Sequence, residues 1–328
     1  MITAAFGLTA TERVLPRLAL DFTTASLDSR ITFTRSGNTA TVINSSGVIV
    51  GINADLPRFD YNPTTLACRG LLIEEARTNL LLNSLIDGTN LATQTVTVTA
   101  AAHTLSFYGS GQVVLSGTHS ATVTGTGAYP SRQTYTFTPT AGSLTLTVTG
   151  TVQFANLELG AFPTSFIPTD GTTKTRNADI ASMTGTNFSN WFNASEGTFV
   201  CWSDNASTGY RTAFITDDGT SNNKMFVQTN ITANGQQWAS RAAATWVVTL
   251  SNQGWTNNGK TAACYKLNDY YYSTNGAAST GDTSAAVPTV NRLVFGAEAA
   301  ANYLNGHVQK FMYFPQRLTN AEIRANSK

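Results

Sequence analysis

The side chains in this sequence that could carry out acid–base chemistry are few. The chain has 328 residues, of which only seven are glutamates. Glycoside hydrolases need paired carboxylates, and on one strand two side chains share a face only at a spacing of two or four residues. Glu74 and Glu75 are adjacent, and Asp217 and Asp218 precede a glycine in a turn pattern. The spacing therefore favours turn or solvated carboxylates over a hydrolase site.

The three histidines offer no base for a nucleophile either. No G-x-S-x-G segment, the pattern that places a serine nucleophile on a sharp turn, lies near His103, His119 or His307. His307 falls on a predicted closing strand, which favours a structural role, and His119 lies in a loop-like segment. We therefore predict that the protein is not an enzyme and has no catalytic residues.

Calcium is the metal that the sequence could best accommodate, because it binds clustered oxygen ligands on loops. The candidate ligands are Asp204, Asp217 and Asp218, with Asn222 and Asn223 close to the last two. No EF-hand spacing is present, and Asp, Asn and Gly favour turns without any metal. Plain turns are the favoured interpretation. We expect no cofactor, with calcium as the weaker alternative.

Sugar binding has the most support, because sugars stack on aromatic faces beside amide and hydroxyl groups. In the run Tyr270–Tyr272, strand alternation directs the outer two rings to one face and the central ring to the other, so at least one face should expose phenols. Trp202 and Trp246 lie in apolar runs and are predicted to be core. An equally supported alternative buries the aromatic residues in the sandwich or a subunit interface. The candidate glycan-binding residues are Trp238, Trp255, Asn268, Asp269, Tyr270 and Tyr272.

Composition excludes several classes of partner. Charged residues make up 12% of the chain, well below the roughly 25% of an average soluble domain, and the net charge is +1. No basic field exists to attract nucleic acid. No apolar run reaches the ~18 residues of a membrane span, and the N-terminal residues lack a signal-peptide pattern. We expect synthesis in a cytoplasm without a signal peptide, no nucleic-acid partner and no membrane insertion.

The cysteines do not form a disulfide framework. Cys68, Cys201 and Cys264 are odd in number and far apart, and no C-x-x-C pair is present for zinc. The last two lie in apolar strand-like runs, which favours buried free thiols. A Cys201–Cys264 bridge is the alternative.

Strand patterns dominate the chain and predict an all-β fold with two antiparallel β-sandwich (jelly-roll) domains. Alternating Thr/Val/Leu segments such as 95–99 and 144–149, separated by Gly- and Pro-rich turns, are typical of a sandwich. All five tryptophans lie in a second β-rich region after residue 184. The predicted organisation is an extended N-terminal wrapping or anchoring segment (1–82), a small sandwich (83–167), a linker (168–183) and a jelly roll (184–328).

Two motifs bracket the small sandwich, and a third follows it. Upstream is the segment 69–81, Arg-Gly-Leu-Leu-Ile-Glu-Glu-Ala-Arg-Thr-Asn-Leu-Leu; downstream is 157–169, Leu-Glu-Leu-Gly-Ala-Phe-Pro-Thr-Ser-Phe-Ile-Pro-Thr. The third segment is 175–179, Thr-Arg-Asn-Ala-Asp. Together they resemble bacteriophage and prophage virion structural proteins, in which such motifs flank a carbohydrate-binding-module-like β-sandwich.

The C-terminal segment carries a second resemblance. The strand-like run 304–314 followed by Arg317-Leu318-Thr319-Asn320-Ala321-Glu322-Ile323 is similar to the end of concanavalin A-like (laminin-G-like) lectin jelly rolls. Thr319 and Glu322 have the spacing of a helix capping box.

The resemblance implies a non-enzymatic tail-fibre, spike or head-fibre protein at the phage particle surface. Its implied partners are other virion proteins, further copies of itself and a host cell-surface glycan, bound weakly at many sites. One alternative is a purely structural capsid or tail decoration or adaptor protein. A second is a depolymerase of surface polysaccharide whose carboxylates meet at a subunit interface.

Overall fold

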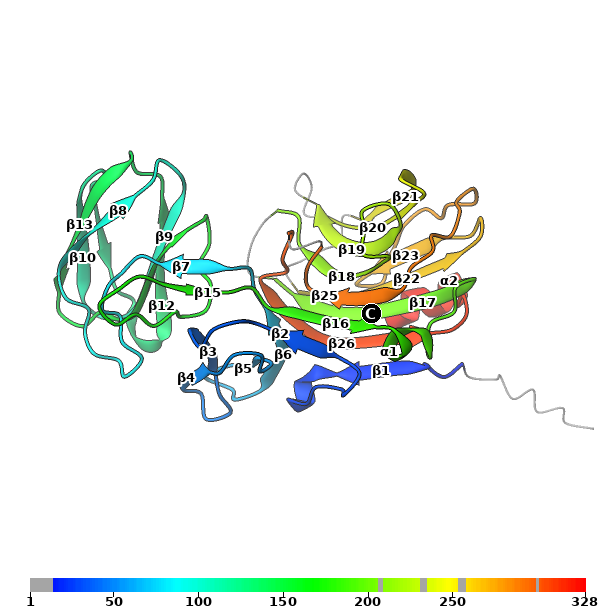
Figure 1. The fold of residues 1–328 in the computed structure, drawn as a ribbon, viewed down its shortest axis with the longest axis horizontal. Helices are drawn as coiled ribbons and strands as arrows, with labels where there is room; N and C mark the ends of the chain where they lie inside the picture. The colour runs from blue at the N-terminus through cyan, green and yellow to red at the C-terminus, as the bar shows by residue number, and fades with distance from the viewer. Residues whose placement is uncertain (1–13, 206–208, 231–234, 253–257, 299–300) are drawn as a thin grey trace, which may run out of the picture.

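The computed structural model describes residues 14–205, 209–230, 235–252, 258–298 and 301–328. In these residues the protein is almost entirely β-structure, as the alternating sequence predicts. Two sandwiches lie side by side and are joined by a two-stranded ribbon (Figure 1). None of the helices in these ranges has the length and hydrophobicity that a membrane span requires.

The large sandwich is built from two antiparallel sheets that enclose an aromatic core. The first sheet contains β1 (Leu18–Asp21), β5 (Phe59–Tyr61), β6 (Cys68–Ile73), β17 (Glu196–Asp204), β22 (Asn258–Lys266), β23 (Tyr271–Thr274), β24 (Ala277–Ala278) and β26 (Gly306–Phe314). The second contains β2 (Thr32–Thr34), β16 (Ile180–Thr184), β18 (Thr212–Asp217), β19 (Lys224–Asn230), β20 (Gly235–Ala242), β21 (Thr245–Asn252) and β25 (Arg292–Phe295).

The N-terminal segment contributes strands to both sheets of the large sandwich. β1 and β6 pair with β26, and β2 pairs with β16. Residues 168–183, predicted as a linker, contain β15 (Lys174–Arg176) and most of β16, and Ala181 and Met183 are buried in the core. The Thr/Lys-rich composition hid this pairing, because a strand of three residues leaves no periodic pattern. The remaining domain boundaries stay predictions.

The small sandwich has the strand alternation that its sequence predicts. Its two sheets are formed by β8 (Gln94–Val98), β10 (Gln112–Gly117), β11 (Ala121–Thr124) and β13 (Gly142–Thr149), and by β9 (His103–Gly109), β12 (Gly127–Phe137) and β14 (Gln153–Leu159). Val and Leu side chains fill the space between the sheets, whereas many of the alternating threonines remain on the outside. This is the pattern of antiparallel sheets with one solvated face.

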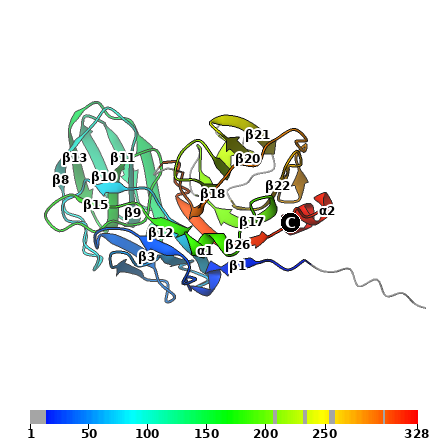
Figure 2. The same cartoon turned by 45° about the vertical axis from the view of Figure 1, so that its right-hand side comes forward.

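Two smaller pairs of strands lie at the junction of the sandwiches. β7 (Arg77–Asn79) and β15 form the connecting ribbon, and β3 (Ala40–Ile43) and β4 (Ile49–Ile52) form a hairpin. In both views the hairpin lies beside the small sandwich and close to the first strands of the large one (Figures 1 and 2). The junction is therefore built from segments that are far apart in sequence.

The helical elements are short: η1 (Phe22–Thr24), α1 (Thr186–Ser189) and α2 (Asn320–Asn326). The predicted capping box at α2 is confirmed, with the Thr319 side chain accepting from the Glu322 backbone and the Glu322 carboxylate accepting from Thr319. The cysteines are free, and Cys201 and Cys264 belong to clusters on opposite faces of the first sheet, so the alternative disulfide is wrong.

Candidate functional site

The predicted glycan-binding aromatics do not form a site, because they are buried in the large sandwich. Trp238 is 0% exposed and packs between Phe199 and Phe214. The Tyr270 hydroxyl donates to the Ala286 carbonyl at 2.9 Å, and the Tyr272 hydroxyl donates to a buried glutamine at 2.7 Å. The expectation of an exposed phenol face is wrong.

Both faces of the tyrosine run are covered. Tyr270 and Tyr272 point into the core facing the second sheet, and Tyr271 lies in a separate apolar cluster with Ile323 of α2. Alternation predicted which rings share a face, but it could not show that a C-terminal helix covers the other face. The equally supported alternative of burial is confirmed for these residues.

The other candidates are scattered. Asn268 is exposed in a left-handed turn with φ of 56°, Asp269 pairs with Arg317 at 2.8 Å, and Trp255 lies outside the described residues. Trp246, predicted to be core, is 53% exposed on the edge strand β21. Trp202 is half-buried beside two lysines rather than in the main core.

The calcium candidates are occupied by protein partners. Asp204 contacts His307, Asp217 pairs with Arg292 and caps a turn, and Asp218 accepts from Thr220 and Asn223. Among the residues described, no group of three or more His, Cys, Asp or Glu side chains could hold a metal ion.

A cavity of about 570 Å³ with both polar and apolar lining lies at the junction of the two sandwiches and is the candidate functional site. We call it the junction cavity. The large sandwich contributes the C-terminal end of β17 and the adjacent N-terminal end of β26 to its walls. The β3–β4 hairpin, β9 and β12 of the small sandwich, and residues 163–166 complete the walls. Its size suits a ligand of one or a few sugar rings.

One wall carries four charged side chains, Asp60, Asp204, His307 and Arg69, which we call the cavity cluster. The His307 Nδ1 atom lies 2.7 Å from Asp204 Oδ1, and its Nε2 atom lies 3.2 Å from Asp60 Oδ2. The guanidinium of Arg69 lies 3.2 Å from Asp204 and 3.8 Å from Asp60, and its side chain is 43% exposed. The arrangement balances two carboxylates with two cations.

Interactions within the cavity cluster shift the pKa values of His307 and Asp204 so that the charged form of each is favoured. Burial alone would lower the pKa of His307, but the Asp204 carboxylate and the hydrogen bond to Asp60 outweigh it and raise that pKa. Burial would likewise raise the pKa of Asp204, but His307 and Arg69 lower it. Both ring nitrogens of His307 face carboxylates, which suits a protonated imidazolium.

The opposite wall comes from the small sandwich. Arg132 of β12 pairs directly with Tyr108 of β9, and its guanidinium carbon lies 6.0 Å from the tyrosine ring. Burial raises the pKa of Tyr108, which keeps its hydroxyl neutral. Phe154 links Tyr108 to Phe166 through edge-on ring contacts of 6.2 and 5.4 Å. The cavity thus has an aromatic and cationic wall facing the cavity cluster.

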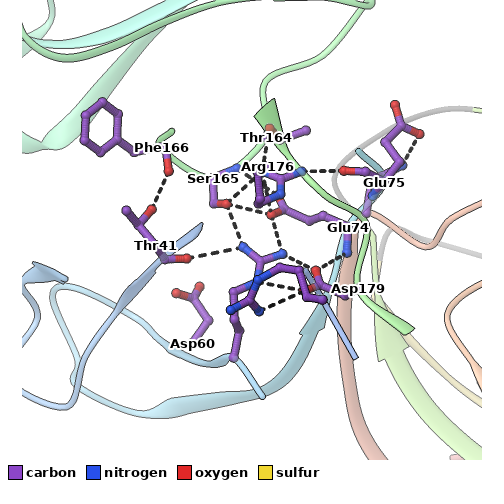
Figure 3. Close-up of polar contacts among 12 residues, drawn as sticks. Thr41, Asp60, Glu74, Glu75, Thr164, Ser165, Phe166, Arg176 and Asp179 are labelled. Atoms are coloured by element: carbon purple, nitrogen blue, oxygen red, sulfur yellow. Dashed lines mark hydrogen bonds and ion pairs between the residues drawn. The ribbon is translucent and has the colours of Figure 1, made fainter. Parts of the chain in front are cut away.

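Beneath the cavity lies a set of buried ion pairs, Arg35, Arg58, Glu74, Arg176 and Asp179, which we call the closed cluster. Asp179 pairs with Arg58 and, at 3.2 Å, with Arg35, and it accepts from the Glu74 backbone at 2.9 Å. Glu74 lies 2.8 Å from Arg58 and 3.2 Å from Arg176. Figure 3 shows Glu74, Arg176 and Asp179 turned toward one another beside Ser165.

Burial would raise the pKa of Glu74, but Arg176 and Arg58 outweigh it and hold that pKa far below its usual range. The Ser165 backbone and hydroxyl add hydrogen bonds of 2.8 and 2.7 Å to the same carboxylate. A buried carboxylate that is this well satisfied stays charged and fixed. The closed cluster therefore joins residues 58, 74, 165, 176 and 179 into one rigid unit.

The motifs at 69–81 and 157–169 are hydrogen-bonded to each other at this junction. Asn79 is buried, and its amide donates to the carbonyls of Ala155 and Ile167 while its oxygen accepts from Leu157 and Leu81. The upstream motif is thereby bonded to the downstream one.

A second contact between the motifs requires a glycine. Arg77 donates to the Leu159 carbonyl, and a Cβ at Gly160, where φ is 133°, would overlap the guanidinium. Only glycine combines this backbone conformation with that close approach.

Known proteins add little to this description. No protein-family model and no curated protein matches the chain. Among solved structures, the CBM40 module of the Ruminococcus gnavus IT-sialidase, bound to α2,3-sialyllactose, is similar with a TM-score of 0.36 and 13% identity, over 42% of this chain and 84% of that one.

Two other structures are similar at the same level. The NanB sialidase of Streptococcus pneumoniae (K499G mutant) has a TM-score of 0.36 and 12% identity, over 44% of this chain and 26% of that one. The receptor-binding domain of botulinum neurotoxin mosaic serotype C/D has a TM-score of 0.35 and 13% identity, over 45% and 39% of the two chains. Similarities this distant concern β-sandwich shape and assign no ligand.

Proposed function

We propose that this protein is a non-enzymatic attachment protein of a virion and that it binds a host-surface glycan in the junction cavity. The observation that carries the proposal is the cavity itself, a concave space of about 570 Å³ whose lining includes Tyr108, Arg132 and the cavity cluster. Aromatic rings beside a few fixed polar groups are what a sugar-binding site needs.

Binding suits the carboxylates of the cavity better than hydrolysis does. A general acid must hold a proton near neutral pH, which requires a raised pKa. The pKa of Asp204 is lowered instead, and Glu74 is held charged by two arginines. These carboxylates are suited to orienting neighbouring cations rather than to transferring protons.

The virion location rests on the motif resemblance. A single shallow sugar site binds weakly, and many copies on one particle convert weak contacts into firm attachment. We therefore propose that the protein acts as a homo-oligomer at the particle surface, together with other virion proteins, as a fibre or spike component.

The proposal is tested by adsorption competition combined with binding to an array of bacterial surface glycans. Purified protein should bind host cells and block virus attachment. Replacing Ile49, which lines the cavity from β4, by Trp should obstruct the cavity and remove both effects. Trp246→Ala, at the exposed edge of the large sandwich, is the matched control and should bind normally.

Other outcomes would identify the alternatives. Absence of binding to cells and to the array, with normal virus attachment, would indicate a structural decoration or adaptor protein. Release of reducing sugar from a bound polysaccharide would indicate a depolymerase, and its loss in Asp60→Asn or Asp204→Asn variants would place that activity in the cavity.

A further inference from the structure

We infer that the junction cavity selects a saccharide that carries a carboxylate, and that Arg132 is the residue that recognises it. This inference rests on the proposed glycan-binding function and names the chemical class of the ligand. It follows from the charges that line the cavity, from the unused hydrogen-bonding capacity of one guanidinium, and from the ring beside it.

Every other charged group that lines the junction cavity has an ion-pair partner. Asp60 and Asp204 face His307 and Arg69, so their charges are balanced within the cavity cluster. Glu74 reaches the cavity from below, but Arg58 and Arg176 already pair with it. Each of these cavity-lining groups therefore already has an ion-pair partner in the protein.

Arg132 differs from them. In the described part of the chain it pairs with no carboxylate, and its one hydrogen bond runs from Nη2 to the Ser106 hydroxyl at 2.7 Å. Its Nε atom is buried without an acceptor among the described residues. A guanidinium offers five donors in a planar fork that fits a carboxylate with two parallel hydrogen bonds. The cavity therefore presents one unpaired positive charge with free donors.

The backbone holds this arginine beside Tyr108. β12 is irregular between Gly127 and Arg132, where its register with β9 shifts, and Arg132 resumes the pairing directly opposite Tyr108. Side chains of directly opposite residues share one face of a sheet, so Arg132 and Tyr108 lie together. Tyr108 is itself buried against Tyr129 and Phe154, so it fixes the arginine side chain rather than offering a free ring face. A carboxylate of a saccharide in the cavity would meet the guanidinium that lines it.

The positive charge of the unpaired Arg132 guanidinium favours an acidic saccharide over a neutral or cationic ligand. A neutral sugar would leave the guanidinium without a counter-charge, and a cationic ligand would be repelled by it. The carboxylates of the cavity cluster do not oppose an acidic ligand strongly, because His307 and Arg69 neutralise them. An acidic saccharide satisfies all the groups that line the cavity.

The test compares matched acidic and neutral saccharides. Titration calorimetry of the full chain would use galacturonic-acid oligosaccharides against their methyl esters, and sialyllactose against its methyl ester, so that only the carboxylate differs. At least one acidic form should bind about tenfold or more tightly than its neutral counterpart, as the loss of a charge-assisted bidentate contact implies. The preference should weaken at high salt.

Variants separate the recognition of charge from folding. Arg132→Gln should remove the preference for the acidic form, and Arg132→Lys should retain part of it, because a lysine keeps the charge but loses the fork. Lys174→Gln, on the connecting ribbon, is the control that removes a distant cation. Thermal unfolding of each variant confirms that it is folded.

Two results would overturn the inference, and only the second would also overturn the proposed glycan-binding function. Equal affinity for the acidic and neutral forms, unchanged in Arg132→Gln, would reject the ligand class while leaving glycan binding intact. No binding to these saccharides or to any glycan on an array would reject both this inference and the proposed function.

Discussion

Two groups of ionic side chains meet at the junction of the sandwiches, and they differ in what surrounds them. The closed cluster is buried, with side-chain exposures of 0–7%, and each of its three arginines and two carboxylates has an ion-pair partner within the cluster. The cavity cluster lies against a space of about 570 Å³, and Arg69 in it is 43% exposed. The two groups are neighbours but face different environments.

The difference separates architecture from recognition. Charges removed from water are costly unless each is paired, and the closed cluster satisfies that condition by joining segments 58, 74, 165, 176 and 179. It therefore fixes how the sandwiches meet. The cavity above it can then keep a precise shape, which a ligand site needs. The following predictions test whether the two groups really have these separate roles.

The largest effect is expected from Asp179→Ala in the closed cluster. Removing this carboxylate leaves Arg35 and Arg58 buried without their principal partner, so the free energy of unfolding should fall by about 3–5 kcal/mol. Urea denaturation measures the loss. Asp170→Ala, which breaks an exposed pair with Lys174, is the control and should leave the free energy of unfolding nearly unchanged. Equal, small losses in both variants would refute the architectural role of the cluster.

The next effect concerns the aromatic residues that the sequence placed at a sugar site. Tyr272→Ala should destabilise the protein by about 3 kcal/mol, because it leaves a cavity in the core and removes the hydrogen bond to Gln236. Denaturation should show this loss, while the folded fraction keeps the glycan affinity of the wild type. A stable Tyr272→Ala protein that no longer binds glycan would contradict this account and place the glycan site in the large sandwich.

A pH-dependent effect distinguishes the cavity cluster from the closed one. The pKa of His307 is raised in the folded state, so its contribution to stability is complete below its unfolded pKa of about 6.5 and is lost as pH rises through the folded value. The stability difference between wild type and His307→Gln should therefore be larger at about pH 5.5 than at about pH 8.5.

The groups that face His307 are Asp60, Asp204 and Arg69. The pKa of Asp204 is lowered by His307 and Arg69, so this carboxylate is ionised at both of these pH values. Changes in other groups cancel, because both proteins share them. A difference that is constant with pH, measured by urea denaturation, would show that the pKa of His307 is the same in the folded and unfolded proteins, and a larger difference at about pH 8.5 would show that folding lowers that pKa.

The smallest effect on stability is expected from Arg132→Gln. This arginine makes one side-chain hydrogen bond and no ion pair within the described residues, so the free energy of unfolding should change by less than about 1 kcal/mol. Its effect should appear in ligand affinity instead. A large loss of stability in thermal unfolding would assign Arg132 to the architecture of the junction.

The sequence predicted the local features of the fold and missed the site. Alternation in segments such as 95–99 and 144–149 predicted strands correctly because a two-residue period is a local property. The junction depends on contacts between residues such as Arg58 and Asp179, 121 positions apart, which no local period encodes. One signal was available: in a chain with 12% charged residues, charges concentrate in the motifs at 69–81 and 175–179.

The most direct test of the account is the glycan affinity of the cavity-obstructing variant Ile49→Trp, measured by surface plasmon resonance against whichever array glycan binds the wild-type protein. The account predicts at least a tenfold loss of affinity with unfolding behaviour close to that of the wild type, and no loss in Trp246→Ala. Unchanged affinity in a folded Ile49→Trp protein would contradict the assignment of binding to the junction cavity.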